Sequence, residues 1–121
     1  FGYDCWDVCA SNSYHYRDHI AGTQRLHYDS WAFREYGHEE AHDDEHVNLM
    51  EFNRGQRPIE VYSAFGGLAV YKAKTLLDGT PEYKEGDCDH CTLHKQLRDN
   101  GYKIYMNPSQ ITLYNETRYT T

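Results

Sequence analysis

The segment IEVYSAFGGLAVYKA, at residues 59–73, predicts two β-strands on either side of a pair of glycines. Residue types common in β-strands lie on both sides of the adjacent glycines Gly66 and Gly67. Because two neighbouring glycines have no Cβ atoms, the backbone there can bend sharply and let another group come close. We therefore expect two strands joined by a glycine bend, with Pro58 at the start of the region.

Downstream of this bend, CDHCTLHKQLRDNG at residues 88–101 predicts an amphipathic helix. Leu93 and Leu97 are four residues apart and therefore share one face of a helix. Asp89 near the start suits the positive end of the helix dipole. Gly101 follows the last helical residue, where glycine commonly ends a helix.

Shorter segments complete the expected secondary structure. WDVCA at residues 6–10 and YKIYM at residues 102–106 predict strands, and residues 74–77 predict a short helix. Residues 14–25 predict a looser segment, and residues 27–36 fit one face of a helix only in part. Together these elements predict an α/β fold, in which helices flank a mixed sheet.

Size and charge limit the class of protein. The chain has 121 residues, which predicts a single domain over residues 1–121. Nineteen acidic residues exceed twelve basic ones and give a net charge of -7, so the surface repels phosphate backbones and anionic headgroups. No run approaches the roughly 20 apolar residues of a membrane helix. We therefore expect no nucleic-acid partner and no membrane span in this segment.

The four cysteines and eight histidines raise the question of metal binding. The cysteines form two local pairs, Cys5 with Cys9 and Cys88 with Cys91. A zinc site with four thiolates, disulfides and buried free thiols are all compatible with this pattern, and free thiols are favoured. One alternative function is therefore a non-catalytic binding module that zinc or another metal stabilises through its Cys and His clusters.

A second metal pattern is HEEAH at residues 38–42, which matches the H-E-x-x-H motif of zinc proteases. In a protease Glu39 would activate water, and His46 could extend the row of histidines on a helix. Such a helix normally lies in a core, whereas acidic residues surround this motif. A solvated loop is therefore favoured, and the metalloprotease is the less favoured alternative.

Asp87, Asp89, His90 and His94 form a further cluster at the start of the predicted helix. Carboxylates in a first helical turn often serve only as caps or partners of the dipole. They can also accept a proton from a hydroxyl nucleophile. The two histidines could hydrogen-bond a sugar or phosphate oxygen, or could be ordinary surface residues.

The order of these motifs resembles a known family. The stretches concerned are WDVCASN (6–12), YDSWAFR (28–34), YSAFGGLAVYKA (62–73) and DCDHCTLHKQLRDNGYKIYMNPSQITLY (87–114). They resemble the C-terminal half of GT-A-fold nucleotide-sugar glycosyltransferases, especially those of large DNA viruses and algae and the fungal capsule-associated mannosyltransferases. The resemblance covers about residues 4–115.

The resemblance implies transfer of a sugar from a nucleotide-diphosphate donor to a carbohydrate or other hydroxyl acceptor, with Mn²⁺ or Mg²⁺ as the cofactor. Asp89 matches the general base of inverting members, and Asp87 is the near alternative. Gly66, Gly67 and the neighbouring Ser63 match the bend that lines the donor-sugar and acceptor pocket.

Other residues of the cluster and of the upstream motif are implied in substrate binding. Asp29 and Trp31 match a segment whose aromatic ring could stack on a sugar face. His90 and His94 follow the general base on the helix and could hydrogen-bond the substrate.

Two features of the family pattern are missing. Its Asp-x-Asp pair, which holds the metal and the diphosphate, does not precede Trp6, and the later pair of Asp87 and Asp89 falls in the wrong half. The LYNET sequence at residues 113–117 lacks the histidine that some members supply to the metal. The metal ligands are therefore not identified in this chain, and we expect a partial domain that lacks the N-terminal, nucleotide-binding half of the same polypeptide.

The expected location stays open between the cytoplasm, as for viral enzymes, and the Golgi lumen. Asn115-Glu116-Thr117 is a glycosylation sequon, which would be used only in a secretory lumen.

Overall fold

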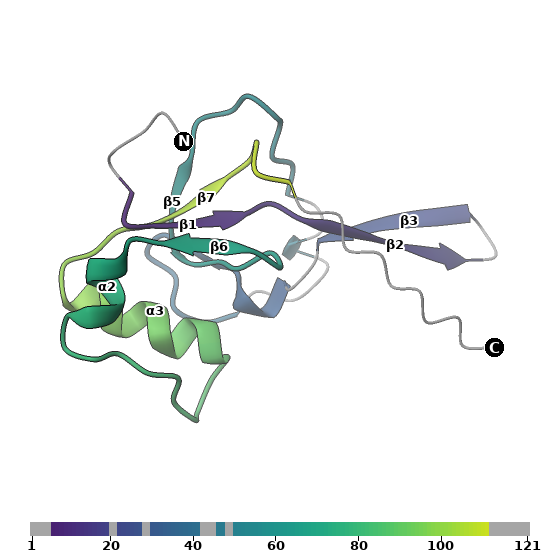
Figure 1. Ribbon diagram of the computed structural model, residues 1–121. Coiled ribbons are helices and arrows are strands. Elements are labelled where there is room, and N and C mark those ends of the chain that lie inside the picture. Colours follow the sequence, from purple (N-terminus) through teal and green to yellow (C-terminus); the bar gives the residue numbers. More distant parts are fainter. Residues whose placement is uncertain (1–5, 20–21, 28–29, 42–45, 48–49, 112–121) are drawn as a thin grey trace.

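The computed structural model describes residues 6–19, 22–27, 30–41, 46–47 and 50–111. The elements in these ranges are β1 (Val8–Ser11), β2 (Tyr14–His19), β3 (Gly22–His27), the 3₁₀ turn η1 (Ser30–Ala32), β4 (Arg34–Glu35), β5 (Ile59–Ser63), β6 (Ala69–Tyr71), α2 (Ala73–Leu77), α3 (Asp89–Asp99) and β7 (Ile104–Asn107) (Figure 1).

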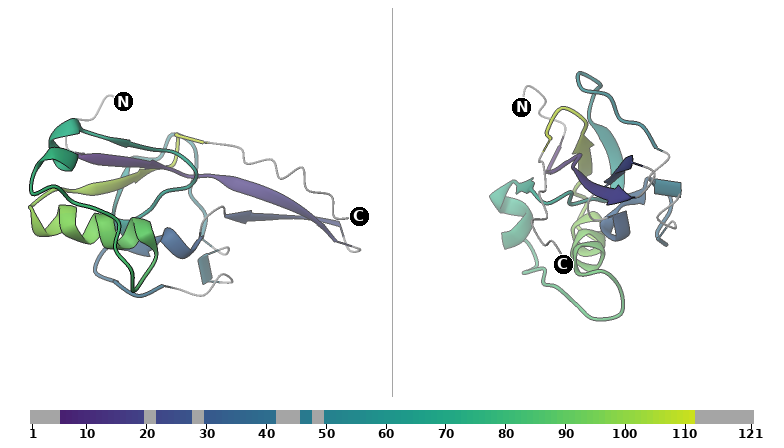
Figure 2. Two further views of the ribbon diagram at one scale, coloured as in Figure 1. Left: turned by 60° about the horizontal axis from the view of Figure 1, so that its bottom comes forward. Right: turned by 90° about the vertical axis from the view of Figure 1, so that its right-hand side faces the viewer.

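Five of the strands form one mixed sheet in the order β4-β5-β7-β1-β6. β1 and β7 are parallel, and the other neighbouring pairs are antiparallel. α3 packs against β5 and covers one face of the sheet, and the short α2 lies near one end of α3 (Figures 1 and 2). The fold is therefore α/β with a mixed sheet and flanking helices, as the sequence predicts. No helix in the described ranges is long and apolar enough to cross a membrane.

The core lies between the central strands and α3. Val8 and Ala10 of β1 are fully buried, and Leu97 of α3 packs in the same cluster. β7 contributes Ile104 and Met106, whose burial alternates with that of more exposed neighbours. This two-residue period follows from the pleat of a strand, and it confirms the strand expected at residues 102–106.

The end of α3 has the hydrogen bonds that the sequence predicts for a glycine stop. Gly101 has a φ of 91°, a conformation that glycine adopts without a steric penalty. The backbone N–H of Gly101 donates to Arg98 O at 2.9 Å, and that of Tyr102 donates to Leu97 O at 3.0 Å. This pair of bonds is the Schellman motif, and it fixes the path from α3 into β7.

The glycine bend is also confirmed. β5 and β6 flank it, and Gly66 and Gly67 have φ values of 65° and 88°. Since β7 and β1 separate β5 from β6 in the sheet, the bend carries the chain across two strands. Gly66 lies against the end of β1, where Ser11 Oγ donates to Gly66 O at 2.8 Å.

Two expectations about the N-terminal half are wrong. Residues 14–25 are not loose, because β2 and β3 pair as an antiparallel hairpin that projects away from the main sheet (Figures 1 and 2). Residues 27–36 contain the turn η1 and the strand β4 in place of a helical face. Both segments mix polar residues with rings, so the period of apolar residues that marks a buried strand or helix is absent from them.

Candidate functional site

The glycine bend and the start of α3 meet through two stacked rings. Phe65, which precedes the glycines, stacks on His90 with ring centroids 4.0 Å apart and an interplanar angle of 12°. Tyr83 contacts His90 edge-on at 5.7 Å. His90 is the second residue of α3, so the stack places the bend beside the first helical turn. The candidate site is built around this turn.

Asp89 is the first residue of α3, and its side chain is exposed. Within the part of the chain that the structure describes, its carboxylate makes no hydrogen bond or ion pair. The N–H groups of the first turn point toward this end of the helix, and their dipoles favour a negative charge there. Asp89 therefore presents an unoccupied carboxylate to solvent at the glycine-bend end of the helix.

The carboxylate of Asp87, the predicted alternative base, is bound by the side chain of Arg34. Its two carboxylate oxygens each accept a hydrogen bond at 2.9 Å from the Arg34 guanidinium. The hydrogen bond from Arg34 holds the pKa of Asp87 below its usual range. One oxygen also accepts the N–H of Cys88 at 2.7 Å. Asp87 is thus a poor proton acceptor, and it anchors the start of α3 to β4.

Arg34, the partner of Asp87, is a residue of this site that no pattern in the sequence indicates. Its side chain is only 2% exposed, and it also donates to the carbonyl oxygens of Trp31 and Glu39. The hydrogen bond to Asp87 raises the pKa of Arg34. Arg34 and Asp87 are 53 positions apart in the chain, and no local pattern in the sequence connects them.

Replacing Asp87 by Ala is expected to lower the free energy of unfolding by about 3 kcal/mol, because a buried guanidinium loses its counter-charge. This loss of stability is at the low end of the range for breaking a buried ion pair, since the Asp87 side chain is 42% exposed and partly solvated. Urea unfolding of the two proteins measures the difference.

The matched control is the double variant Arg34→Met with Asp87→Ala, which removes the unpaired charge. It is expected to be more stable than Asp87→Ala alone. A double variant less stable than the single one would contradict the assignment of the loss to an uncompensated buried charge.

His94 is a core residue, which corrects its predicted place at the substrate. Its ring is 0% exposed, with Nδ1 2.8 Å from Ser63 Oγ and Nε2 2.7 Å from the Tyr71 hydroxyl oxygen. Ser63, also predicted to contact substrate, is 2% exposed. Ser63 and Tyr71 lie on β5 and β6, so the ring joins both strands around the glycine bend to α3.

Burial keeps this imidazole neutral by lowering the pKa of His94 to about 3. An unfolded histidine has a pKa of about 6.5 and binds a proton below that pH, whereas the folded ring does not. Stability is therefore expected to fall as the pH drops from about 6.5 toward 3, and His94 accounts for about 2 kcal/mol of the loss at pH 5. Unfolding in urea at pH 7 and pH 5 measures it.

His94→Gln is the control for this pH dependence. A glutamine amide can hydrogen-bond both hydroxyls but does not titrate. The variant is expected to lose less stability between pH 7 and pH 5 than the native protein does. Equal losses in the two proteins would show that another group causes the pH dependence.

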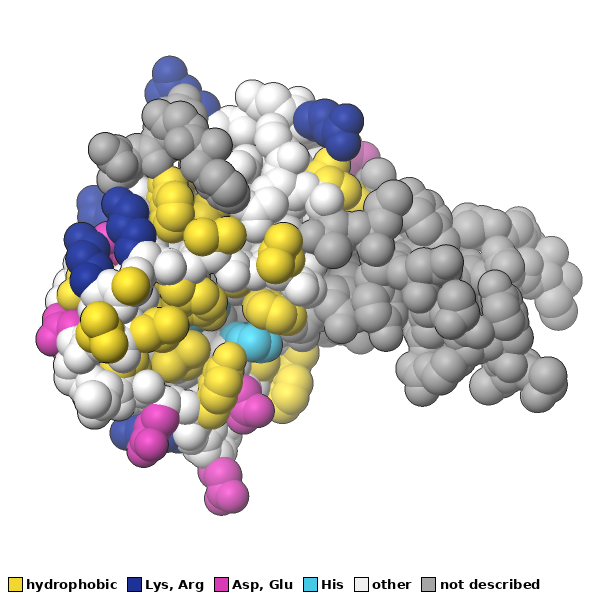
Figure 3. Space-filling view, in the orientation of Figure 1, with side chains coloured by type: hydrophobic (Ala, Val, Ile, Leu, Met, Phe, Trp, Pro, Cys, Tyr) yellow, Lys and Arg dark blue, Asp and Glu magenta, His cyan; other side chains and the backbone are white. Residues whose placement is uncertain are grey.

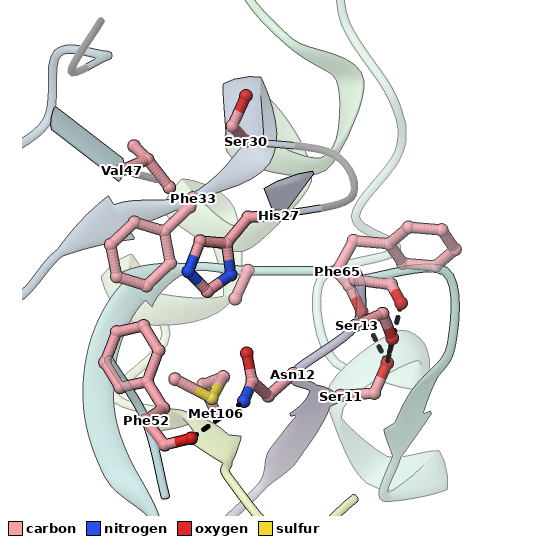
Figure 4. Close-up of a pocket in the computed structure, with 12 residues that line it drawn as sticks. Ser11, Asn12, Ser13, His27, Ser30, Phe33, Val47, Phe52, Phe65 and Met106 are labelled. Atoms are coloured by element: carbon pink, nitrogen blue, oxygen red, sulfur yellow. Dashed lines mark hydrogen bonds between the residues drawn. The ribbon is translucent and has the colours of Figure 1, made fainter. Parts of the chain in front are cut away.

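Two pockets lie near these residues. The first lies beside the end of β1, where Ser11, Asn12 and Ser13 face Phe33 and Phe52 (Figure 4). Several of its polar groups already have partners, because Ser11 Oγ lies 3.1 Å from Ser13 Oγ and Asn12 Nδ2 donates to the Tyr14 hydroxyl. The two serine hydroxyls and the Asn12 amide nitrogen are therefore engaged within the protein.

The second pocket opens beside the first turn of α3 and is lined by charged residues. They are Arg34, Glu39, Asp87, Lys95 and Arg98, and the uncharged walls come from Tyr62, Ser63 and Cys91. The Arg98 guanidinium stacks on the Tyr62 ring at 3.9 Å. Three basic groups against two acidic ones leave this pocket with a net positive charge.

Apolar side chains gather on the face that carries β6 and α2 (Figure 3). The large exposed apolar side chains in or next to β6 and α2 are Leu68, Val70, Leu76 and Leu77. Large apolar side chains exposed together in this way are uncommon on monomeric proteins.

The other predicted site residues fall in two groups. Trp31 lies in η1 with its side chain 58% exposed, and Gly67 is exposed at the bend. Asp29 lies outside the described residues, as do Cys5 and His42 of the two metal patterns.

The metal alternatives gain no support from the positions that are described. Residues 38–41 are not helical, although the protease motif needs a helix. Cys9 lies in β1, an interior strand of the sheet, whereas Cys88 and Cys91 lie at the start of α3. The described ranges contain no group of three or more His, Cys, Asp or Glu side chains that could hold a metal ion.

No protein-family model matches the chain, and no curated protein sequence matches it.

Proposed function

We propose that this chain is the acceptor-side half of a GT-A-fold glycosyltransferase, which transfers a sugar from a nucleotide-diphosphate donor to a hydroxyl acceptor. One observation carries the proposal. The Phe65–His90 stack joins the glycine bend to the start of α3, beside the carboxylate of Asp89, which has no partner in the described part of the chain. The stack brings together Phe65 and His90, which are 25 positions apart in the chain, and this contact supports the proposal.

Asp89 is the proposed general base. Its carboxylate accepts the proton of the acceptor hydroxyl while that oxygen forms a bond to the anomeric carbon of the donor sugar. The bond from that carbon to the diphosphate oxygen breaks, and the nucleoside diphosphate leaves. Direct displacement of this kind inverts the anomeric configuration. Asp87 cannot substitute for Asp89 in this role, because Arg34 holds both of its oxygens.

The acceptor wall is proposed to consist of exposed rings near this carboxylate. Trp31 follows from the resemblance, and its side chain is largely exposed. Tyr83 is exposed and contacts His90 edge-on, beside the first turn of α3. Sugars present C–H faces to rings and hydroxyls to carboxylates, which makes this combination suited to a carbohydrate acceptor.

Mn²⁺ or Mg²⁺ would neutralise the charge that develops on the leaving diphosphate. The described residues offer no cluster for such a cation. We therefore propose that its ligands, and the groups that hold the nucleotide, belong to a further half of the same polypeptide.

The sequence encoded immediately upstream of Phe1 tests this proposal without any purified protein. We expect about one hundred further residues upstream, a length similar to that of the present domain. They should include an apolar strand that ends in Asp-x-Asp. An uninterrupted upstream reading frame without such a pair would contradict the proposed half-domain.

A further inference from the structure

Cys88 and Cys91 form a close dithiol at the start of α3. Cys88 is at the N-cap position of the helix, without a side-chain capping hydrogen bond, and Cys91 is the third helical residue, so the C-x-x-C spacing spans the first turn. Both residues are buried in one small cluster with Ala32. Cys88 and Cys91 pack in the same cluster, one helical turn apart, and Cys91 Sγ lies 3.6 Å from the carbonyl oxygen of Ala32. A C-x-x-C pair at a helix N-terminus is the arrangement in which a disulfide can close across one turn.

The charged pocket gives a route to this dithiol. Cys91 lines it together with the basic side chains of Arg34, Lys95 and Arg98. The positive charge of these groups attracts anionic reagents to the pocket. Cys9 has no such setting, because it is 1% exposed in β1 and its thiol donates to Gln110 Oε1 at 3.6 Å.

We propose that Cys88 and Cys91 are a redox-active pair, which forms a reversible disulfide by exchange with an anionic low-molecular-weight disulfide such as oxidised glutathione. The proposal does not depend on glycosyl transfer, since it needs only the two thiols and the pocket.

The exchange has two steps. The Cys91 thiolate attacks one sulfur of oxidised glutathione, which forms a mixed disulfide and releases one glutathione thiolate. The Cys88 thiolate then attacks Cys91 Sγ, which closes the protein disulfide and releases the second glutathione. Two protein thiols are oxidised, one glutathione disulfide is reduced, and the two thiol protons pass to the released glutathione molecules.

The rate of this exchange is expected to be low. The hydrogen bond with Cys88 and the burial of the thiol raise the pKa of Cys91, so little thiolate is present at neutral pH. Higher pH should therefore speed the reaction, while the ratio of oxidised to reduced glutathione sets its end point. An equilibrium measurement is the appropriate test.

The test uses the native 121-residue chain, held in mixtures of reduced and oxidised glutathione at pH 8 until no further change occurs. Samples are quenched with acid, unfolded, alkylated and digested. We expect the peptide with Cys88 and Cys91 to change from two alkylated thiols to none, with the loss of two hydrogens, as the share of oxidised glutathione rises. Cys9 is the internal control and should remain alkylated.

Single variants test the order of the steps. Cys88→Ser should stop at the glutathione adduct on Cys91, because the second thiol is missing. Cys91→Ser should carry little adduct, because Cys88 does not line the charged pocket. Cys91→Ala repeats that test if the serine variant fails to fold, as judged by circular dichroism.

Three outcomes would overturn the proposal. The pair could stay fully alkylated in oxidised glutathione alone, or Cys9 could be oxidised before it. Stoichiometric zinc in the protein purified without an affinity tag, lost in Cys88→Ser, would mean that the pair is a metal ligand.

Discussion

Asp89→Asn is expected to lower kcat for glycosyl transfer by a factor of about 10² to 10⁴, the usual contribution of a general base. Asparagine has nearly the same shape as aspartate but cannot accept the proton of the acceptor hydroxyl. The affinity for the donor should be unchanged, because the proposed role concerns the acceptor alone. The experiment uses the polypeptide that carries both proposed halves, and it follows acceptor-dependent release of the nucleoside diphosphate.

Asp99→Asn is the matched control for this variant. Asp99 is the last residue of the same helix, and it is exposed and paired only weakly, at 3.5 Å from Lys95. Its replacement should leave transfer unchanged. The free energy of unfolding of Asp89→Asn should also lie within about 1 kcal/mol of that of the native protein, because an exposed charge at a helix start contributes little more than that. Near-normal transfer by a folded Asp89→Asn protein would remove Asp89 from the mechanism.

Gly66→Ala is expected to lower the free energy of unfolding by about 4 kcal/mol, the largest loss that we expect from a single methyl group here. An added Cβ atom would overlap the Ser11 carbonyl oxygen and lie 2.9 Å from the carbonyl carbon. Both atoms belong to the backbone of β1, a central strand, and cannot move aside cheaply. The φ of 65° adds the strain of a left-handed conformation. Urea unfolding measures the loss.

Gly67→Ala separates the two causes. Gly67 has a similar φ of 88° but is exposed. Its replacement should lower the free energy of unfolding by only about 1 to 2 kcal/mol, because backbone strain is then the sole cause of the loss. If Gly67→Ala cost as much as Gly66→Ala, contact with Ser11 would not be the reason for the glycine at position 66.

The C-terminal half of the fold could be predicted from local signals. The glycine bend and the helix stop at Gly101 are recognised because φ values of 65° and 91° favour glycine. The alternation of burial in β7 is likewise a local property of one strand. In each case the residues that determine the structure are neighbours in the chain.

Long-range pairing is what the sequence could not provide. The β2–β3 hairpin was not predicted, because its strands carry polar residues and no regular period of apolar residues. His94 looked like a surface ligand because a helix start with acidic neighbours gives no sign that its ring lies between Ser63 and Tyr71. The sequence does not distinguish Asp87 from Asp89. The structure does, because Arg34 pairs with Asp87 and thereby gives it a structural role.

Acceptor-dependent turnover of nucleotide sugars by the polypeptide that carries both proposed halves tests whether the protein is a glycosyltransferase. A panel of nucleoside-diphosphate sugars and carbohydrate acceptors is assayed with Mn²⁺ or Mg²⁺ and with a chelator. We predict release of nucleoside diphosphate that requires both the acceptor and the divalent cation, together with a new glycosidic product. Binding of a nucleotide sugar without any transfer to a hydroxyl acceptor across the panel would contradict the proposed function.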